Sequence, residues 1–250
     1  FLMGEVDGDN DTGMQVSEQF TAPNRLHATY NFDLLEWGGL SVHEIKASIS
    51  KAIDIFNGTG RLSFAFSNHD VPRVASRQLK ALDLKPEQSD AMQLLLLKLL
   101  TCLIGSACIF QGEELGLEDA RDIPLDRLQD PWGIEFAPTF LGRDTCRTPM
   151  VWNSNEANGG FSTATKTWLP ISKQHLKRSA LSQAAKPTTI YHKFSSFLKW
   201  RKGQPALISS NEITIPTGGS KTIVFMRKSK KQILRCIFDF EKLTTRFEEI

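Results

Sequence analysis

Two short apolar runs in this chain each end at a carboxylate. The first run, 1–6, reaches Glu5 almost at once, and the second, 62–66, is followed directly by Ser67-Asn68-His69-Asp70. Short apolar runs bounded by turn residues are typical of buried strands. Acids at the ends of parallel strands gather at one edge of the sheet, where enzymes of this architecture place their sites. The pattern therefore predicts a site built from strand ends.

Strand and helix signals alternate along the chain. Strands are predicted at 1–5, 27–35, 62–66 and 107–110, and helices at 41–56, 89–103 and 188–202. The helix at 41–56 opens on Ser41-Val42-His43-Glu44, the pattern of a capping box. Repeated strand and helix units imply a parallel sheet with right-handed crossovers, either doubly wound or closed into a barrel.

Helical and strand periodicity is lost between residues 116 and 182, where Asp, Pro, Trp and Arg dominate. A loop of this length is uncommon in a compact domain unless it serves a binding or catalytic site. Beyond it, short β-like runs at 213–215, 222–226 and 233–238 predict a small antiparallel appendage. The basic stretch 227–231 is interpreted as a solvated turn.

Composition excludes several classes of protein. The 250 residues are 40% hydrophobic and 23% charged with a net charge of +2, which is typical of a globular protein rather than a nucleic-acid binder. The four cysteines form no CxxC pair, so neither a structural metal site nor a disulfide framework is expected, and a reducing, cytoplasmic setting is predicted. The apolar segment 91–110 is interpreted as a buried helix and strand, not a membrane span.

Glu5 and the pair His69-Asp70 are the residues whose chemistry stands out. Glycoside hydrolysis needs one protonated and one ionised carboxyl group at the scissile bond. The apolar neighbours of Glu5 are expected to desolvate it and favour its neutral form, although it also fits an ordinary charged strand end. An adjacent imidazole and carboxylate can grip vicinal sugar hydroxyls, and the same pair also occurs as a helix cap.

The motifs FLMGEV, FSNHDVPR, IFQGEELG and GRDTCRTPMVW resemble the α-amylase superfamily of retaining glycoside hydrolases. With DPWGIEF they are most similar to bacterial α-glucosidases and oligo-1,6-glucosidases. The resemblance implies the C-terminal half of a (β/α)8 barrel, from the fifth strand onward, followed by a small antiparallel β domain. Residues 1–203 would form the barrel half, with 116–182 as its long eighth-strand loop, and 204–250 the β domain.

The resemblance also implies site roles, position by position. Glu5 matches the general acid/base and Asp70 the aspartate that stabilises the transition state. His69 and Arg147 match substrate-binding residues. Arg143 is a further substrate-binding match, for which a loop-fixing salt bridge is the equal alternative.

Several other positions follow from the same motifs. Glu113 and Glu114 are expected to be structural partners of loop residues. Pocket lining or simple packing is expected of three residues: Gln111, Trp132 and Trp152. Two positions depart from the family pattern, Thr145 where glycine is common and Ala137 where an aromatic residue is common, which leaves the shape of the sugar pocket open.

The family's nucleophilic aspartate has no counterpart in this chain and would precede Phe1. The chain is therefore expected to be inactive alone, with the missing N-terminal barrel half as its partner and an α-linked oligosaccharide or glucoside as substrate. A transglycosylase or sugar isomerase of the same superfamily, a non-catalytic scaffold relative and a doubly wound binding protein are the alternatives. No cofactor is expected; the run 7–11 resembles a calcium loop in composition, but it lacks the downstream acid of an EF-hand and is interpreted as a turn.

Overall fold

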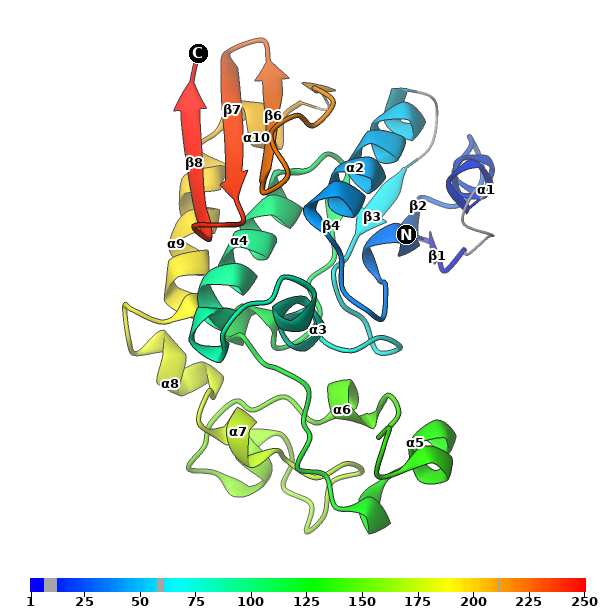
Figure 1. Ribbon diagram of the computed structural model, residues 1–250, viewed down its shortest axis with the longest axis vertical. Helices are drawn as coiled ribbons and strands as arrows, with labels where there is room; N and C mark the ends of the chain where they lie inside the picture. The colour runs from blue at the N-terminus through cyan, green and yellow to red at the C-terminus, as the bar shows by residue number, and fades with distance from the viewer. Residues whose placement is uncertain (7–12, 58–60, 211) are drawn as a thin grey trace. The chain divides into compact units, whose positions relative to one another are not determined.

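A parallel sheet of four strands follows the order of the sequence (Figure 1). The computed structural model describes residues 1–6, 13–57, 61–210 and 212–250. The strands are β1 (Met3–Gly4), β2 (Ala28–Asn31), β3 (Leu62–Phe64) and β4 (Ser106–Ala107). Thr29 lies opposite Gly4 on one side and opposite Leu62 on the other, which fixes the register of the first three strands. The parallel pairing predicted from the alternating pattern is confirmed.

The chain divides into two units, each with its own packing. The first unit contains Phe1–Phe66, Leu95–Ile109 and Phe197–Ile250, and the second contains Ser67–Leu94 and Phe110–Ser196. The parallel sheet belongs to the first unit. His69 and Asp70, which follow the third strand in sequence, belong to the second.

All four parallel strands are shorter than the sequence indicated, most clearly the second and the fourth. The run 27–35 is a strand only as far as Asn31, because the Asn31 side chain accepts a hydrogen bond from the Asp33 N–H and starts a turn of 3-10 helix, Phe32–Leu34. The run 107–110 contributes only the end of β4. An Asn that bonds the backbone two residues on competes with the sheet ladder, and this competition is invisible to hydrophobic periodicity.

Helix α2 (Val42–Asn57) belongs to the first unit, as does the parallel sheet. Its capping box is present: the Ser41 N–H donates to Glu44 Oε2 at 2.7 Å, and the Glu44 N–H donates to Ser41 Oγ at 3.2 Å. The helix buries Ile45 and Ile49. A buried hydrogen bond of 3.1 Å from Asn31 Nδ2 to Ser48 Oγ joins it to β2.

The other helices are mostly short. They are α1 (Gly13–Phe20), α3 (Val74–Ala81), α4 (Ser89–Cys102), α9 (Ile190–Lys202) and α10 (Pro205–Ile208). Helices α4 and α9 confirm the helices predicted at 89–103 and 188–202. Within the described part of the chain, no helix has the length and apolar character needed to cross a bilayer.

The long region 116–182 is not one unstructured loop. It contains α5 (Pro131–Phe136), α6 (Asp144–Arg147), α7 (Lys173–Leu176) and the start of α8 (Ala180–Ala184). Helices of one or two turns produce no readable periodicity, which is why the sequence predicted only a loop. Two small apolar clusters support the region, one around Leu117 and Met150 and one around Ile123 and Leu128.

The predicted antiparallel appendage is confirmed and has one more strand than expected. Its strands are β5 (Glu212–Ile213), β6 (Thr222–Ser229), β7 (Gln232–Asp239) and β8 (Thr244–Glu249), paired in that order (Figure 1). Strand β8 has the sequence TTRFEE and was missed because Phe247 is its only large apolar residue. The Phe247 ring packs on Trp200 of α9 with ring centroids 4.8 Å apart.

The basic stretch 227–231 is not a solvated turn throughout, which corrects the prediction. Arg227 lies inside β6 and is only 1% exposed. Its Nη1 donates to the carbonyls of Cys102 and Leu103 at 2.6 and 2.7 Å, and its Nη2 donates to the Ser210 carbonyl. The first two carbonyls end helix α4, which has no later N–H to satisfy them. One buried guanidinium therefore joins the antiparallel sheet to the C-terminal end of helix α4.

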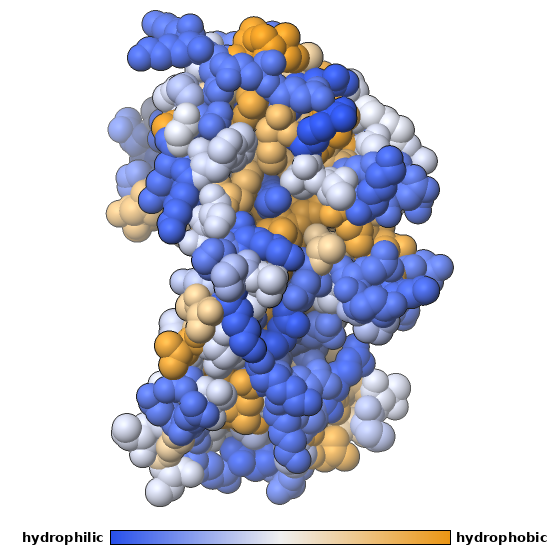
Figure 2. Space-filling view, turned by 90° about the vertical axis from the view of Figure 1, so that its left-hand side faces the viewer, coloured by the Kyte–Doolittle hydropathy of each residue, from blue (hydrophilic) through white to orange (hydrophobic). Residues whose placement is uncertain are grey.

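Most of the molecular face drawn in Figure 2 is hydrophilic, with smaller hydrophobic areas between. Scattered apolar residues of this kind are normal for a protein surface. The acidic run that resembles a calcium loop, 7–11, lies outside the described residues. Among the residues that are described, no three His, Cys, Asp or Glu side chains come together as a metal site.

Candidate functional site

A tight turn after the third strand presents His69 and Asp70. Asn68 Oδ1 accepts hydrogen bonds from the N–H groups of Asp70 and Val71 at 2.8 and 3.1 Å. Ser67 Oγ accepts from the Val74 N–H at 2.8 Å, which starts helix α3. Asn and Ser at these positions form local side-chain to backbone bonds that fix a turn. The motif FSNHD thus specifies its own geometry.

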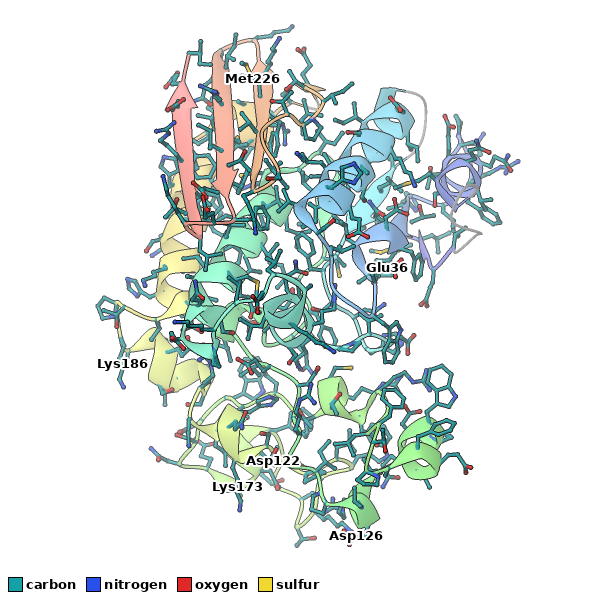
Figure 3. The ribbon with its side chains drawn as sticks, in the orientation of Figure 1. Glu36, Asp122, Asp126, Lys173, Lys186 and Met226 are labelled. Atoms are coloured by element: carbon teal, nitrogen blue, oxygen red, sulfur yellow. The ribbon has the colours of Figure 1, made fainter. Side chains whose placement is uncertain are left out.

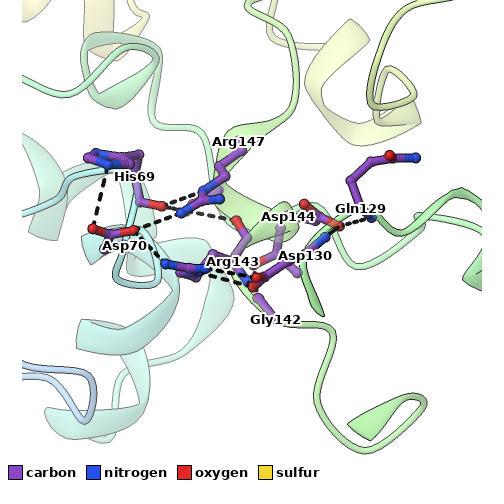
Figure 4. Close-up of polar contacts among 10 residues, drawn as sticks. His69, Asp70, Gln129, Asp130, Gly142, Arg143, Asp144 and Arg147 are labelled. Carbon is purple, nitrogen blue, oxygen red and sulfur yellow. Dashed lines mark hydrogen bonds and ion pairs between the residues drawn. The ribbon is translucent and has the colours of Figure 1, made fainter. Parts of the chain in front are cut away.

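Two arginines converge on the Asp70 carboxylate (Figure 4). Asp70 Oδ1 accepts from Arg147 Nη2 at 2.7 Å and from Arg143 Nη1 at 3.1 Å. Asp70 Oδ2 lies 3.5 Å from His69 Nε2. Arg147 also donates from Nε to the His69 carbonyl at 2.7 Å, so that one guanidinium holds both residues of the pair. The structure therefore brings together four of the five predicted site residues.

Asp130 holds Arg143 in place from the side opposite Asp70 (Figure 4). Its Oδ2 accepts from the Arg143 N–H at 2.6 Å and Nε at 3.2 Å, and its Oδ1 accepts from Nη2 at 2.9 Å. The Asp130 side chain is fully buried. The hydrogen bond from Arg143 lowers the pKa of Asp130, and the same bond raises the pKa of Arg143. Both groups are therefore charged at neutral pH, and charge-assisted, two-point pairs of this kind are strong.

Close contacts hold together the two ends of the segment that carries Asp130 and Arg143. Asp144 Oδ2 accepts from the backbone N–H groups of Gln129 and Asp130 at 2.6 and 2.9 Å. Gly142 has φ +66°, and a Cβ there would lie 2.5 Å from Asp130 Oδ2 and 2.6 Å from the Gly133 nitrogen. Only glycine fits this position, because any side chain would push Asp130 out of reach of Arg143.

Arg73 is a buried scaffold residue that the sequence did not single out, although it lies in the quoted motif FSNHDVPR. It is 1% exposed. Its guanidinium donates to the carbonyls of Gln111 at 2.6 Å and Cys146 at 3.0 Å, and its backbone N–H donates to Asp119 at 2.9 Å. Burial lowers its pKa. Arg73 thereby ties the turn that holds Asp70 to the segment that holds Arg147.

Glu113 and Glu114 have the loop-binding contacts expected of structural residues. Glu113 is 1% exposed, and its Oε2 accepts from the Phe110 N–H at 3.1 Å. Burial raises its pKa to about 7. Glu114 Oε2 accepts from the Gly112 N–H at 2.8 Å, and burial raises the pKa of this residue too.

The apolar setting predicted for Glu5 is not found in this chain. Glu5, in the first unit, is exposed, and so are Phe1, Leu2 and Met3 beside it in sequence, at 85%, 60% and 40%. Of the two alternatives for Trp132 and Trp152, buried packing is wrong, because they are 51% and 53% exposed, and pocket lining stays a prediction.

The remaining predicted positions make contacts within the second unit. The side chain of Gln111 donates to the Thr148 carbonyl at 3.5 Å. Thr145 donates to the Gly142 carbonyl at 3.5 Å, and Ala137 packs against the cluster around Ile123 and Leu128. Both family departures are therefore accommodated in the segment next to Arg143.

The arrangement of charges suits the binding of a polyhydroxyl ligand. The side chains of His69 and Asp70 remain 61% and 36% exposed, while Arg147 and Arg143 are 20% and 28% exposed. An open carboxylate and imidazole supported by two less exposed guanidinium groups offers acceptors and donors in fixed directions. Rigid groups of this kind can stabilise a developing charge without reorganisation.

The sequence of this chain is similar to those of several known proteins. Residues 1–210 match the model of the alpha amylase catalytic domain. A probable alpha-glucosidase of Rhizobium meliloti (strain 1021) is 38% identical over 95% of this chain and 41% of its own length. An oligo-1,6-glucosidase of Halalkalibacterium halodurans is 27% identical over 84% of this chain and 39% of its own length.

Solved structures extend the comparison to the fold. An alpha-glucosyl transfer enzyme, XgtA, superposes with a TM-score of 0.81 at 33% identity over 95% of this chain and 42% of its own. The trehalulose synthase MutB superposes with a TM-score of 0.79 at 21% identity, which shows likeness of fold alone. The chain spans less than half the length of these relatives. The predicted fold class, a C-terminal barrel half followed by an antiparallel β domain, is confirmed, and the chain belongs to the alpha-amylase family.

Proposed function

We propose that this chain is part of a retaining α-glucosidase and that its substrate is an α-linked oligosaccharide or glucoside. This assignment rests on the hydrogen bonds that Arg143 and Arg147 donate to Asp70, beside His69. They occur in a chain 38% identical to a probable alpha-glucosidase. The domain limits of the proposal are 1–203 for the barrel half and 204–250 for the β domain. The cytoplasmic setting predicted from the cysteines is part of it.

In the proposed mechanism Glu5 protonates the leaving oxygen, and an aspartate outside this chain attacks the anomeric carbon. Water then resolves the covalent intermediate, with Glu5 as base. Asp70 and His69 bind sugar hydroxyls, and bind them more tightly as the ring flattens toward an oxocarbenium ion, which lowers the barrier. Arg147 and Arg143 hold the Asp70 carboxylate in a fixed orientation.

We further propose that a second barrel half completes the protein, on the same chain or on a separate one. Eight strands set the diameter and shear of a closed barrel, and the parallel sheet described here has four. Strand β1 lies at an edge of that sheet and exposes Met3 at 40%. An open edge beside exposed apolar side chains favours pairing with another strand.

The test is an assay of the purified chain on a nitrophenyl α-glucoside, alone and with the part of the Rhizobium meliloti relative that precedes its matched region. We expect no turnover by the chain alone and measurable turnover by the pair. Glu5→Gln and Asp70→Asn should each lower the rate of the pair by about a hundredfold or more. Glu36→Gln changes a carboxylate that is likewise exposed (Figure 3) and should have no effect.

Two outcomes would contradict the proposal. Robust turnover by the chain alone would show that the nucleophile does not lie in a missing half. A stable complex of the two halves that binds but never cleaves the glucoside would favour a scaffold protein.

Glucosyl transfer is the second candidate function, because an alpha-glucosyl transfer enzyme is 33% identical to this chain. Hydrolases and transferases of this kind share the covalent step and differ in the acceptor. Product analysis of the active pair, with water and a free sugar competing as acceptors, separates them. Free glucose as the main product supports hydrolysis, and a glucosylated sugar supports transfer.

A further inference from the structure

Helix α5 places an exposed tryptophan beside the arginine that contacts Asp70. The Arg143 guanidinium carbon lies 5.0 Å from the centroid of the Trp132 ring, and Nη1 of the same group donates to Asp70. One guanidinium group therefore separates the indole from the carboxylate. Trp132 is 51% exposed, so that half of its surface remains open to a ligand.

Close contacts of the neighbouring residues fix the position of Trp132, although its own side chain is half exposed. It follows Asp130 by two residues, and Asp130 is bound to Arg143 through three hydrogen bonds. Gly133 leaves no room for movement, because a Cβ there would lie 2.5 Å from the Leu141 carbonyl oxygen. The two ends of the segment 130–143 are thus clamped together, and the indole is held at a constant place relative to Asp70.

We propose that Trp132 is a specificity-determining residue of the sugar site and that its ring is the stacking platform for a second sugar unit, next to the one held by Asp70 and His69. Sugar rings present an apolar face of C–H groups, and exposed aromatic rings bury such faces well. Asp70 and the platform together select a disaccharide over a monosaccharide. Asp130 is the positioning residue that keeps Arg143 between them.

A second exposed tryptophan lacks this connection. Trp168, in the same unit, is 61% exposed. Among the described residues, no hydrogen bond, ion pair or ring contact joins Trp168 to Asp70 or to the two arginines that bind it. Trp168 is therefore a matched control for residue type and exposure.

The test compares the binding of glucose and maltose to the pair of halves defined above, by calorimetry or NMR titration. Glu5→Gln is present throughout so that maltose is not cleaved. Since this inference rests on the proposed function, Asp70→Asn is included and should weaken the binding of both sugars. Trp132→Ala should weaken maltose binding by about tenfold and change glucose binding by less than twofold. Trp168→Ala should change neither. Trp132→Phe keeps an aromatic face and should restore most of the maltose affinity.

A second readout serves as a check on a variant that does not fold. Maltose should change the tryptophan fluorescence of the Glu5→Gln pair and of the same pair carrying Trp168→Phe, and this change should be reduced by Trp132→Phe. Equal weakening of glucose and maltose by Trp132→Ala, or no weakening of either, would overturn the platform while leaving the Asp70 site intact. Failure of the Glu5→Gln pair to bind either sugar, or binding that Asp70→Asn leaves unchanged, would overturn both proposals.

Discussion

Replacing the buried arginine of β6 should cost this protein a large part of its stability. Arg227→Met keeps much of the apolar stem and removes the guanidinium, which leaves the carbonyls of Cys102, Leu103 and Ser210 without that donor. A buried polar group that loses its partner costs about 1–3 kcal/mol. The substitution also removes the cost of burying a cation, which offsets part of this loss of stability. The same burial lowers the pKa of Arg227. We expect a net loss of about 3 kcal/mol, the range found when one partner of a buried charged contact is removed.

Urea unfolding followed by tryptophan fluorescence measures this loss. Trp200 packs against Phe247 of the β domain, so its emission reports the unit in which Arg227 lies. The control is Arg235→Met on β7, whose side chain is 43% exposed and pairs with Glu248 at 3.4 Å. Exposed pairs contribute at most about 1 kcal/mol, so this variant should unfold close to the unsubstituted chain.

Arg227→Lys separates charge from shape. One ammonium group cannot reach three carbonyls in the directions that the planar guanidinium serves. The stability of Arg227→Lys should therefore fall between those of Arg227→Met and the unsubstituted chain. A loss below about 1 kcal/mol for Arg227→Met, with an unchanged m-value, would refute the reasoning. It would mean that the end of α4 is satisfied in some other way.

Three further predictions concern single groups. Burial raises the pKa of Glu113 to about 7, so between about pH 4.5 and 7 the folded state binds a proton that the unfolded state has released. The free energy of unfolding should therefore fall as pH rises from about 4.5 through 7. Glu113→Gln should flatten this slope in urea titrations at several pH values. His175 has the opposite sign: burial lowers its pKa to about 4, its Nε2 donates to the Glu118 carbonyl at 2.7 Å, and stability should be lost as pH falls from about 6.5 toward 4. His175→Asn should reduce that acid sensitivity, and thermal melting at pH 7 and pH 4.5 measures the difference. Ser41→Ala removes one half of the α2 capping box and should cost about 1 kcal/mol in urea unfolding, whereas Ser41→Asp should keep most of it.

The elements that the sequence predicted well are those whose signals are local. The capping box at Ser41, the apolar spacing of α2 and the runs that became β1 and β3 all depend on residues within one element. Element ends were less certain, because Asn31 ended β2 through a side-chain bond that leaves no trace in hydrophobic periodicity. The short helices of 116–182 were missed because helices of one or two turns are too short to produce a recognisable periodicity.

The sugar site was predicted only through its motifs. The residue types of His69-Asp70 indicated hydroxyl binding, and the family resemblance supplied Arg143 and Arg147. Nothing in the spacing of these residues showed that both guanidinium groups reach one carboxylate, since Asp70 and Arg147 are 77 positions apart. Asp130 and Arg73 were missed because their partners are distant main-chain and side-chain groups, and charged residues in loops are usually solvated.

Glu5 and Arg227 illustrate what the sequence predicts and what only the tertiary structure decides. By itself the sequence determined the alternation of strands and helices, the parallel sheet with its antiparallel appendage, and the acids that follow the strands, because periodicity and turn chemistry act over a few residues. Only the tertiary structure decided that the apolar neighbours of Glu5 lie exposed and that Arg227, in a run of basic residues, is buried against the end of a helix. Burial and the pairing of charges depend on which distant segments meet, and a linear pattern does not contain that information.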